Sequence, residues 1–165
     1  MGRRSRSWVT PVSEDAENIE AIRRLVAQSA RRLDSGLFSD YVDLFTDDGT
    51  YVLQADSTEI GSTMIWLDLS RDELSALLEE SPQHVHDLAG RTHMVTVDDV
   101  QIDGETATGR STFAVFRTDQ SGRSEVYAVG YYDDQLRRQS DGWRIAARRV
   151  RSQTRMFRTP TPMPL

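Results

Sequence analysis

Apolar residues near the start of the chain recur every three or four positions, as they do along one face of a helix. The stripe consists of Ile19, Ile22, Leu25, Val26, Ala30 and Leu33. This spacing predicts an amphipathic helix, with Ser13 as its N-cap and Ser35-Gly36 as its end. Asp34 is then the last helical residue. Because a carboxylate is unfavourable at the negative end of a helix dipole, we expect Asp34 to have a role other than helix stability.

Shorter patterns predict the remaining elements. A second, short helix begins at Phe38, and a strand over residues 50–55 follows the turn at 47–49. The segment from Ser70 to Glu73 has the pattern of a capping box and opens a third helix, which Pro82 is expected to end. From residue 91 the pattern changes to the alternation of strands. Four strands are expected, at residues 92–102, 107–117, 124–138 and 143–153.

The short turns between these strands indicate an antiparallel meander. Helices followed by a strongly curved antiparallel sheet predict an α+β cone with N-terminal helices packed on the sheet. At 165 residues the chain suits one domain. We place that domain at residues 13–158, after an N-terminal extension at 1–12. The Pro-rich tail at 159–165 cannot be helical, and we expect it to be disordered or to lie along a partner subunit.

The composition excludes several kinds of chemistry. The chain has no Cys, and all 20 basic residues are Arg, so thiol nucleophiles, disulfides and lysine Schiff bases are excluded. No phosphate loop, dinucleotide fingerprint or Gly-x-Ser-x-Gly elbow occurs, and we expect no cofactor. With no secretory signal and no run of about 20 apolar residues, a cytoplasmic protein without a membrane partner is expected.

The net charge of −6 is unevenly distributed. Residues 137–165 contain eight Arg and one acidic residue. A basic segment of this kind is a candidate for nucleic-acid binding. However, its Arg residues lie on an alternating strand without interleaved aromatic residues, so we expect them to pair with carboxylates and expect no nucleic-acid partner.

One carboxylate and one imidazole form the candidate catalytic pair. His93, Val95 and Val97 share a face of the first meander strand, and a curved sheet leaves a cavity on its inner side. If that face points inward, Asp34 at the end of the first helix can orient His93 as a general base. In the alternative interpretation, Asp34 caps backbone amides of the turn that follows the helix, and His93 is a hydrogen-bonded residue of the cone.

Other side chains are candidate substrate contacts. Arg151 lies with Arg149 on the expected face of Trp143 in the last strand, where it binds a substrate carboxylate or enolate if the face points inward. Tyr127 and Tyr131 share a face of the third meander strand, and Tyr132 lies on the other. The remaining candidate contacts are Tyr51 and Trp66.

Three histidines raise the question of a metal. His84 and His86 have a spacing that, with His93, suits a three-nitrogen site. They follow Pro82 in a loop without a second strand that supplies matched ligands. We therefore expect a solvated loop and no metal.

Several segments together resemble the SnoaL-like branch of the nuclear transport factor 2-like (NTF2-like) superfamily. They are residues 19–23, 32–34, 45–51, His93, 107–110 and 141–145. The resemblance implies a cone fold and places Asp34 and His93 at the catalytic Asp and His of enzymes such as scytalone dehydratase, a lindane dehydrochlorinase and a bile-acid dehydratase. Two positions depart from the bile-acid dehydratase pattern, which has Tyr where this chain has Ser29 and Asp where it has Val115.

A second branch is also similar. The small β subunits of aromatic-ring-hydroxylating dioxygenases resemble residues 64–78, 91–93 and 148–150, and they carry Leu-Asp at the position of Leu33-Asp34. In those subunits the pair belongs to a scaffold and is not catalytic.

The resemblance leads to one expected function and two alternatives. The first is a cofactor-independent lyase, isomerase or cyclase that acts on a hydrophobic, polyketide- or steroid-like molecule through Asp34 and His93. The alternatives are a non-catalytic dioxygenase β subunit, which binds a catalytic α subunit, and a small-molecule-binding module. Family members are commonly oligomers, so a homodimer or homotrimer is expected.

Overall fold

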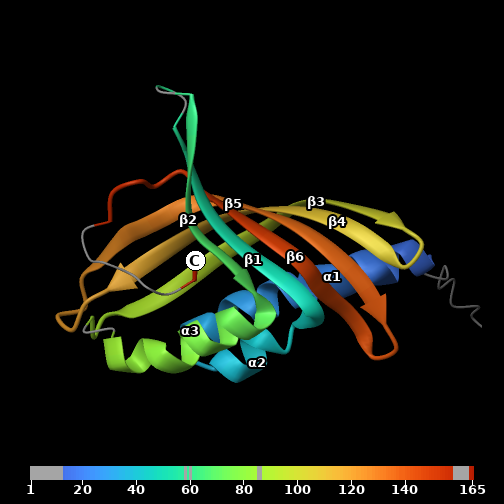
Figure 1. Cartoon of the computed structure of the whole chain (residues 1–165), viewed down its shortest axis with the longest axis horizontal. Coiled ribbons are helices and arrows are strands. Elements are labelled where there is room, and N and C mark those ends of the chain that lie inside the picture. Colours follow the sequence, from blue (N-terminus) through green and yellow to red (C-terminus); the bar gives the residue numbers. More distant parts are fainter. Residues whose placement is uncertain (1–12, 58, 60, 85–86, 158–163) are drawn as a thin grey trace, which may run out of the picture.

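Three helices lie on one face of a six-stranded sheet (Figure 1). The structure is a computed structural model that describes residues 13–57, 59, 61–84, 87–157 and 164–165. Its elements are α1 (Glu14–Asp34), α2 (Phe38–Val42), β1 (Phe45–Ser57), β2 (Ser62–Ser70), α3 (Arg71–His84), β3 (Gly90–Asp103), β4 (Thr106–Thr118), β5 (Ser124–Gln139) and β6 (Gly142–Ser152). The predicted α+β cone is confirmed.

The strand order is β2-β1-β6-β5-β4-β3. Strands β3 to β6 form the predicted antiparallel meander, but β1 joins β6 in parallel, so the sheet is mixed. Strand β2 pairs antiparallel with β1 and was not expected from the sequence. Apolar and polar residues do not alternate cleanly in β2, which lies at an edge of the sheet, so the sequence has no clear strand pattern there.

The helix ends follow the sequence closely. The Ser13 side chain accepts a hydrogen bond from the Ala16 amide at 3.2 Å. At the start of α3, Glu73 accepts from the Ser70 amide at 2.8 Å, and the Glu73 amide donates to Ser70 at 3.3 Å, which completes the predicted capping box. The expectation that Pro82 ends α3 is wrong by two residues, since the helix continues to His84.

A β-bulge in β6 reverses the faces that the sequence suggests. Leu136 of β5 pairs with Ile145, but Gln135 pairs with Ala147, so Ala146 is an extra residue in β6. After this bulge Arg148 points inward, whereas Arg149 lies exposed on the outer face. The interpretation that Trp143 shares a face with Arg149 and Arg151 is therefore wrong.

A second bulge has the same effect in β5. Val115 of β4 pairs with Ala128 and Phe116 pairs with Val126, which leaves Tyr127 as the extra residue. Tyr127 is buried in the core, and the outer face carries Tyr131. The two tyrosines do not share a face, because one residue in a strand changes the parity of all that follow.

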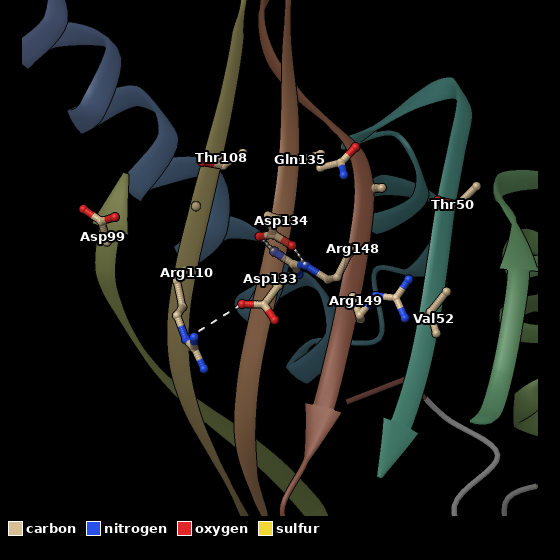
Figure 2. A pocket seen from close by; sticks show the side chains of 12 residues that line it. Thr50, Val52, Asp99, Thr108, Arg110, Asp133, Asp134, Gln135, Arg148 and Arg149 are labelled. Carbon is tan, nitrogen blue, oxygen red and sulfur yellow. Dashed lines mark hydrogen bonds and ion pairs between the residues drawn. The ribbon is translucent and has the colours of Figure 1, made fainter. Parts of the chain in front are cut away.

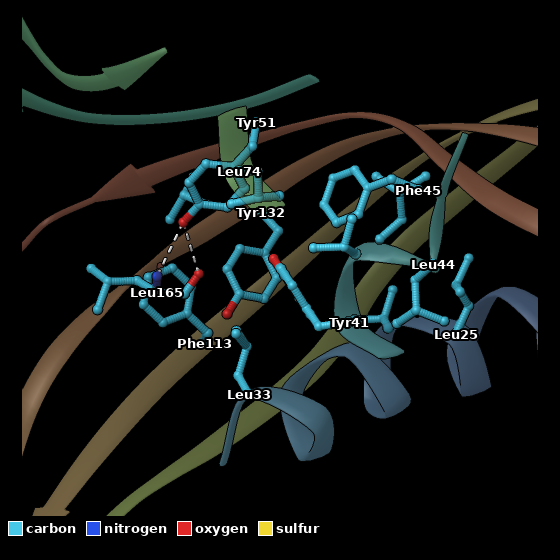
Figure 3. Close-up of a cluster of buried hydrophobic side chains, with 14 of the residues drawn as sticks. Leu25, Leu33, Tyr41, Leu44, Phe45, Tyr51, Leu74, Phe113, Tyr132 and Leu165 are labelled. Atoms are coloured by element: carbon cyan, nitrogen blue, oxygen red, sulfur yellow. Dashed lines mark hydrogen bonds between the residues drawn. The ribbon is translucent and has the colours of Figure 1, made fainter. Parts of the chain in front are cut away.

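The core lies between the helices and the inner face of the sheet (Figure 3). Its centre is aromatic, with the rings of Phe113 and Tyr132 stacked at 4.6 Å and those of Tyr41 and Phe45 edge to face at 5.5 Å. The close approach of Phe113 to β5 depends on Gly130. A Cβ atom at that position would lie 2.9 Å from the Phe113 ring.

Candidate functional site

Asp34 and His93 lie in direct contact where α1 ends beside the edge strand β3. Asp34 Oδ1 is 2.5 Å from His93 Nδ1, and Asp34 Oδ2 accepts the backbone amide of His93 at 2.9 Å. These two contacts fix the imidazole relative to α1. An imidazole that donates through Nδ1 to a carboxylate carries its lone pair on Nε2, the arrangement of an oriented general base. The backbone amide that this carboxylate accepts belongs to His93 in β3, whereas the alternative interpretation expected amides of the turn after the helix.

The His93 ring is closed off from solvent. Its side chain is 3% exposed, and Nε2 is buried without a hydrogen-bond partner in the part of the chain that the structure describes. Asp34 and His93 border a pocket of about 220 Å³, whose lining also includes Phe38, Arg91 and Pro164. The Asp34–His93 pair borders the pocket, but Nε2 of His93, the atom that would take a proton, is not exposed in it.

Ion pairs fill the polar rim of this pocket. Arg117 donates to both carboxylate oxygens of Asp87, at 2.8 and 2.7 Å. These hydrogen bonds hold the pKa of Asp87 below its ordinary value, so this carboxylate stays charged and occupied. The Arg91 guanidinium lies 4.5 Å from the centre of the Tyr127 ring. The rim therefore has a fixed charge pattern beside Asp34 and His93.

Three predicted substrate contacts do point inward, and the chain's own C-terminal residues contact each of them. The Tyr51 hydroxyl donates to the backbone oxygen of Leu165 at 3.3 Å and accepts its amide at 3.0 Å. Phe157 packs against Trp66 at 5.4 Å and against Tyr127 at 5.2 Å, measured between ring centres. The space expected for a substrate is thus occupied at these side chains.

The other two predicted contacts lie on the outer face of the sheet. Arg151 donates to Asp56 at 2.9 and 2.5 Å, and the Arg110 guanidinium lies 4.8 Å from the Tyr131 ring centre. The Arg151 hydrogen bonds lower the pKa of Asp56. Because of the bulge at Ala146, Arg151 does not reach the interior, and it is placed apart from Asp34 and His93.

The outer face also has a hollow of about 340 Å³ over β4, β5 and β6 (Figure 2). Arg110 and Asp133 form an ion pair across it at 3.8 Å. Arg149 lines the same hollow and donates to Gln54 at 2.8 Å. The charged side chains of this surface are therefore largely paired with one another.

A buried polar cluster was missed by the sequence reasoning. Arg148 donates through Nε and Nη2 to Asp134, both at 2.8 Å, and through Nη1 to Ser29, also at 2.8 Å. Its guanidinium stacks 4.4 Å from the ring centre of Tyr132, and burial raises the pKa of that tyrosine. Two adjacent carboxylates facing two adjacent arginines across a hairpin were the available signal, but the bulge decides which of them point inward.

The expectation of a solvated loop without a metal concerns His84 and His86. His86 and the side chain of His84 lie outside the described residues. Among the residues that are described, no three His, Asp or Glu side chains gather in an arrangement that would hold a metal ion. Within the same ranges, none of the helices has the length and apolar character needed to cross a membrane.

The helices packed on the curved mixed sheet form an NTF2-like cone. The chain belongs to the SnoaL-like domain family, whose match covers residues 14–149. It is 30% identical to the β subunit of the methanesulfonate monooxygenase hydroxylase of Methylosulfonomonas methylovora, over 82% of this chain and 81% of that protein. It is 22% identical to the β subunit of 2-aminobenzenesulfonate 2,3-dioxygenase from an Alcaligenes species, over 88% of this chain and 97% of that one.

A solved structure gives the same fold. The β subunit of an aromatic-ring-hydroxylating dioxygenase from Novosphingobium aromaticivorans superposes with a TM-score of 0.76 at 20% identity. The match covers 87% of this chain and 94% of the other. At this identity the likeness establishes the fold alone.

Proposed function

We propose that the chain is a non-catalytic β subunit that assembles with the catalytic α subunit of a hydroxylating oxygenase. The observation that carries the proposal is the occupied interior. Leu165 fills the space beside Tyr51, and Phe157 fills the space between Trp66 and Tyr127. A cone filled by its own chain suits a scaffold better than an enzyme that must admit a large hydrophobic substrate. Both of the relatives named above are β subunits as well.

In this function the contact between Asp34 and His93 is a brace. It ties the end of α1 to the edge strand β3 through one side-chain and one backbone contact. The buried Nε2 atom, which has no hydrogen-bond partner among the described residues, is then a tolerated cost and has no part in chemistry. The same pair that resembles a catalytic dyad therefore has a sufficient structural role.

The outer face of the sheet is the proposed docking surface for the α subunit. Arg149 and Arg151 project there from β6, next to the charged hollow lined by Arg110 and Asp133. Complementary charges at an interface set partner choice and association rate. An α subunit with a matching acidic surface would exchange some of these internal pairs for contacts between subunits.

Co-expression with a hydroxylase α subunit encoded in the same genome tests the proposal. We expect the two chains to co-purify and the assembled oxygenase to need this chain for full turnover. The double variant Asp34→Asn with His93→Ala should assemble and keep that turnover. Arg149→Glu should weaken assembly, whereas Arg24→Glu, on the exposed side of α1, should not. Loss of oxygenase turnover in the double variant, with assembly intact, would contradict a purely structural role.

A second candidate function is a cofactor-independent lyase, isomerase or cyclase for a hydrophobic, polyketide- or steroid-like molecule. The observation that favours it is the 2.5 Å contact between Asp34 and His93, which leaves Nε2 as the base. Here His93 would move a proton and Asp34 would orient it. Turnover by the isolated chain that both Asp34→Asn and His93→Ala abolish would establish this function. Equal turnover in all three proteins would reject it.

Both functions are compatible with a homodimer or a homotrimer, which we propose as the state of the isolated chain. Light scattering coupled to size-exclusion chromatography distinguishes the two from a monomer. A single species with the mass of one chain at all concentrations would contradict the proposal.

A further inference from the structure

The hairpin of β1 and β2 extends beyond the other strands of the sheet (Figure 1). Strand β6 pairs with β1 only as far as Ala55, whereas β1 and β2 stay paired up to Ser57 and Ser62. In this part of β2 the consecutive side chains of Met64 and Ile65 are 60% and 56% exposed. Because successive side chains of a strand point to opposite faces, both faces of β2 are open here.

Arginines from the end of the sheet hold this hairpin in place. Arg151 is hydrogen-bonded to Asp56 near the end of β1, and Arg155 donates to Glu59 at 2.6 and 3.1 Å. Thr63 of β2 also donates to Asp56, at 3.0 Å. The exposed strand is therefore fixed in its extended conformation. A strand that is already ordered loses little conformational entropy when it binds a partner.

The outer edge of β2 is free to pair with another strand. Within the described ranges, β1 is the strand that pairs with β2, and β2 lies last in the strand order. Residues 62–65 pair with 54–57 in unbroken register, and the bulge that follows leaves Trp66 as the extra residue. The backbone groups that face away from β1 over residues 62–65 thus form a regular row, which is the template for strand addition.

The two edges of the sheet differ in how they are protected. The other edge strand, β3, contains a bulge at Asp98, and Asp99 follows it directly. Bulges and charged side chains are the features that keep sheet edges from pairing. Residues 62–67 of β2 contain no charged side chain. Because a chain with a net charge of −6 repels its own copies, contact between copies is favoured where charge is absent.

We propose that residues 62–65 of β2 form an interface with the same residues of a second copy of this chain. The two strands pair antiparallel around a two-fold axis, so that one edge supplies both halves of the contact and the two sheets become continuous. Met64 and Ile65 then lie beside their counterparts, one on each face. This inference does not rest on the function as a β subunit, because the face proposed to bind an α subunit carries Arg149 and Arg151.

Cysteine cross-linking of the whole chain tests the pairing. The natural chain has no Cys, so each variant with one Cys at a position from 62 to 65 has a single thiol. A two-fold axis through an antiparallel pair places one residue opposite itself, at a distance that suits a disulfide, and sets its neighbours farther from their own copies. Under mild oxidation one of the four variants should form a covalent dimer at least tenfold faster than the others.

Met94→Cys is the matched control, because Met94 on the edge strand β3 is 62% exposed, close to the value for Met64. It should cross-link as slowly as the three slow variants. Equal rates for all four positions and for Met94→Cys would show random collision and overturn the proposal.

Light scattering coupled to size-exclusion chromatography supplies an independent measurement. The unaltered chain should have the mass of two copies. Met64→Glu should weaken the dimer at least tenfold, because it brings like charges together at the interface, whereas Met94→Glu should not. The mass of one or of three copies at all concentrations would overturn the proposal, as would a Met64→Glu variant that dimerises like the unaltered chain.

Hydrogen exchange distinguishes the second copy from an α subunit as the occupant of this edge. Exchange at residues 62–65 should slow as the concentration of the isolated chain rises. Exchange that is independent of this concentration, and slows only when an α subunit is added, would assign the edge to that subunit and overturn the proposal. Co-purification of the Arg149→Glu variant with an α subunit is measured separately and tests only the proposed function.

Discussion

Arg148 and Asp134 form a two-point ion pair in the middle of the protein, and the side chain of each is 1% exposed. The third donor of the guanidinium binds Ser29 on α1, and its face lies on the ring of Tyr132. One cation therefore links α1, β5 and β6. Ser29 stands where the resemblance to the bile-acid dehydratase has a Tyr, and in this chain that position supports a structural cluster.

Breaking this pair should destabilise the protein strongly. Asp134→Asn leaves the Arg148 charge buried without a counter-charge, and such changes cost about 3–5 kcal/mol. We expect the free energy of unfolding in urea to fall by that amount. Arg149→Met, one residue along and on the exposed face, should change it by less than about 1 kcal/mol.

The double replacement Asp134→Leu with Arg148→Met removes both charges at once. Apolar pairs of similar volume often replace buried ion pairs at little cost, so this variant should be more stable than Asp134→Asn alone. A double variant whose loss of free energy equals the sum of the losses in Asp134→Leu alone and Arg148→Met alone would show that the two charges are not coupled.

Gly130 should tolerate no side chain. A Cβ atom there would lie 2.3 Å from the backbone oxygen of Arg151 and 2.9 Å from the ring of Phe113. Gly130→Ala therefore forces β5 away from β6 or moves the stacked Phe113, and we expect a loss of about 1–3 kcal/mol or more in thermal or urea unfolding. Gly90→Ala is the matched control, because nothing lies within 4 Å of its Cβ position. Equal stability of the two variants would contradict this packing.

The periodicity of the sequence predicted the helices and the meander correctly, because each depends on a local repeat. It failed at Ala146 and Tyr127, where one extra residue changes the face of every later side chain. Bulges leave no mark in the alternation itself. Arg151 was consequently assigned to the interior as a candidate, and the inward Arg148 was missed.

The meeting of Asp34 with His93 was predictable for a related reason. A helix end and a strand face are both local features, and the resemblance to the family supplied their proximity. The packing of Leu165 against Tyr51 had no local signal, since a Pro-rich tail has no periodicity and the contact joins residues 114 positions apart. Only the folded structure reveals that the predicted substrate contacts already have occupants.

Three buried tyrosines should resist titration. Burial raises the pKa of Tyr41, Tyr51 and Tyr132. In the folded protein, absorbance at 295 nm should therefore report ionisation of these three tyrosines at a higher pH than in urea, where all five tyrosines of the chain should ionise near pH 10.

The same groups determine stability in alkali. Because its pKa is raised by burial, each of these tyrosines stabilises the folded protein while its hydroxyl is neutral. This contribution to the free energy of unfolding is complete below pH 10 and declines as the pH rises above that value. The unfolding free energy should decrease by about 1.4 kcal/mol per pH unit for each of the three tyrosines. Ionisation of all five tyrosines near pH 10, with the native circular dichroism spectrum retained, would contradict their burial.

Asp34 allows the structural and catalytic roles of the pair to be separated. Asp34→Ala removes the acceptor of both the His93 ring and its backbone amide, and unsatisfied buried donors cost about 1–3 kcal/mol each. If the pair is a brace, hydrogen exchange at residues 90–95 should accelerate and the unfolding free energy should fall, whereas Asp40→Ala, in an exposed position of α2, should change neither. Asp34→Asn keeps one acceptor oxygen, so its unfolding free energy should fall by less than that of Asp34→Ala. If instead Asp34→Ala leaves exchange and stability unchanged, the carboxylate is not needed to hold β3. Its 2.5 Å contact with His93 would then favour proton transfer as the reason for its position at the end of α1.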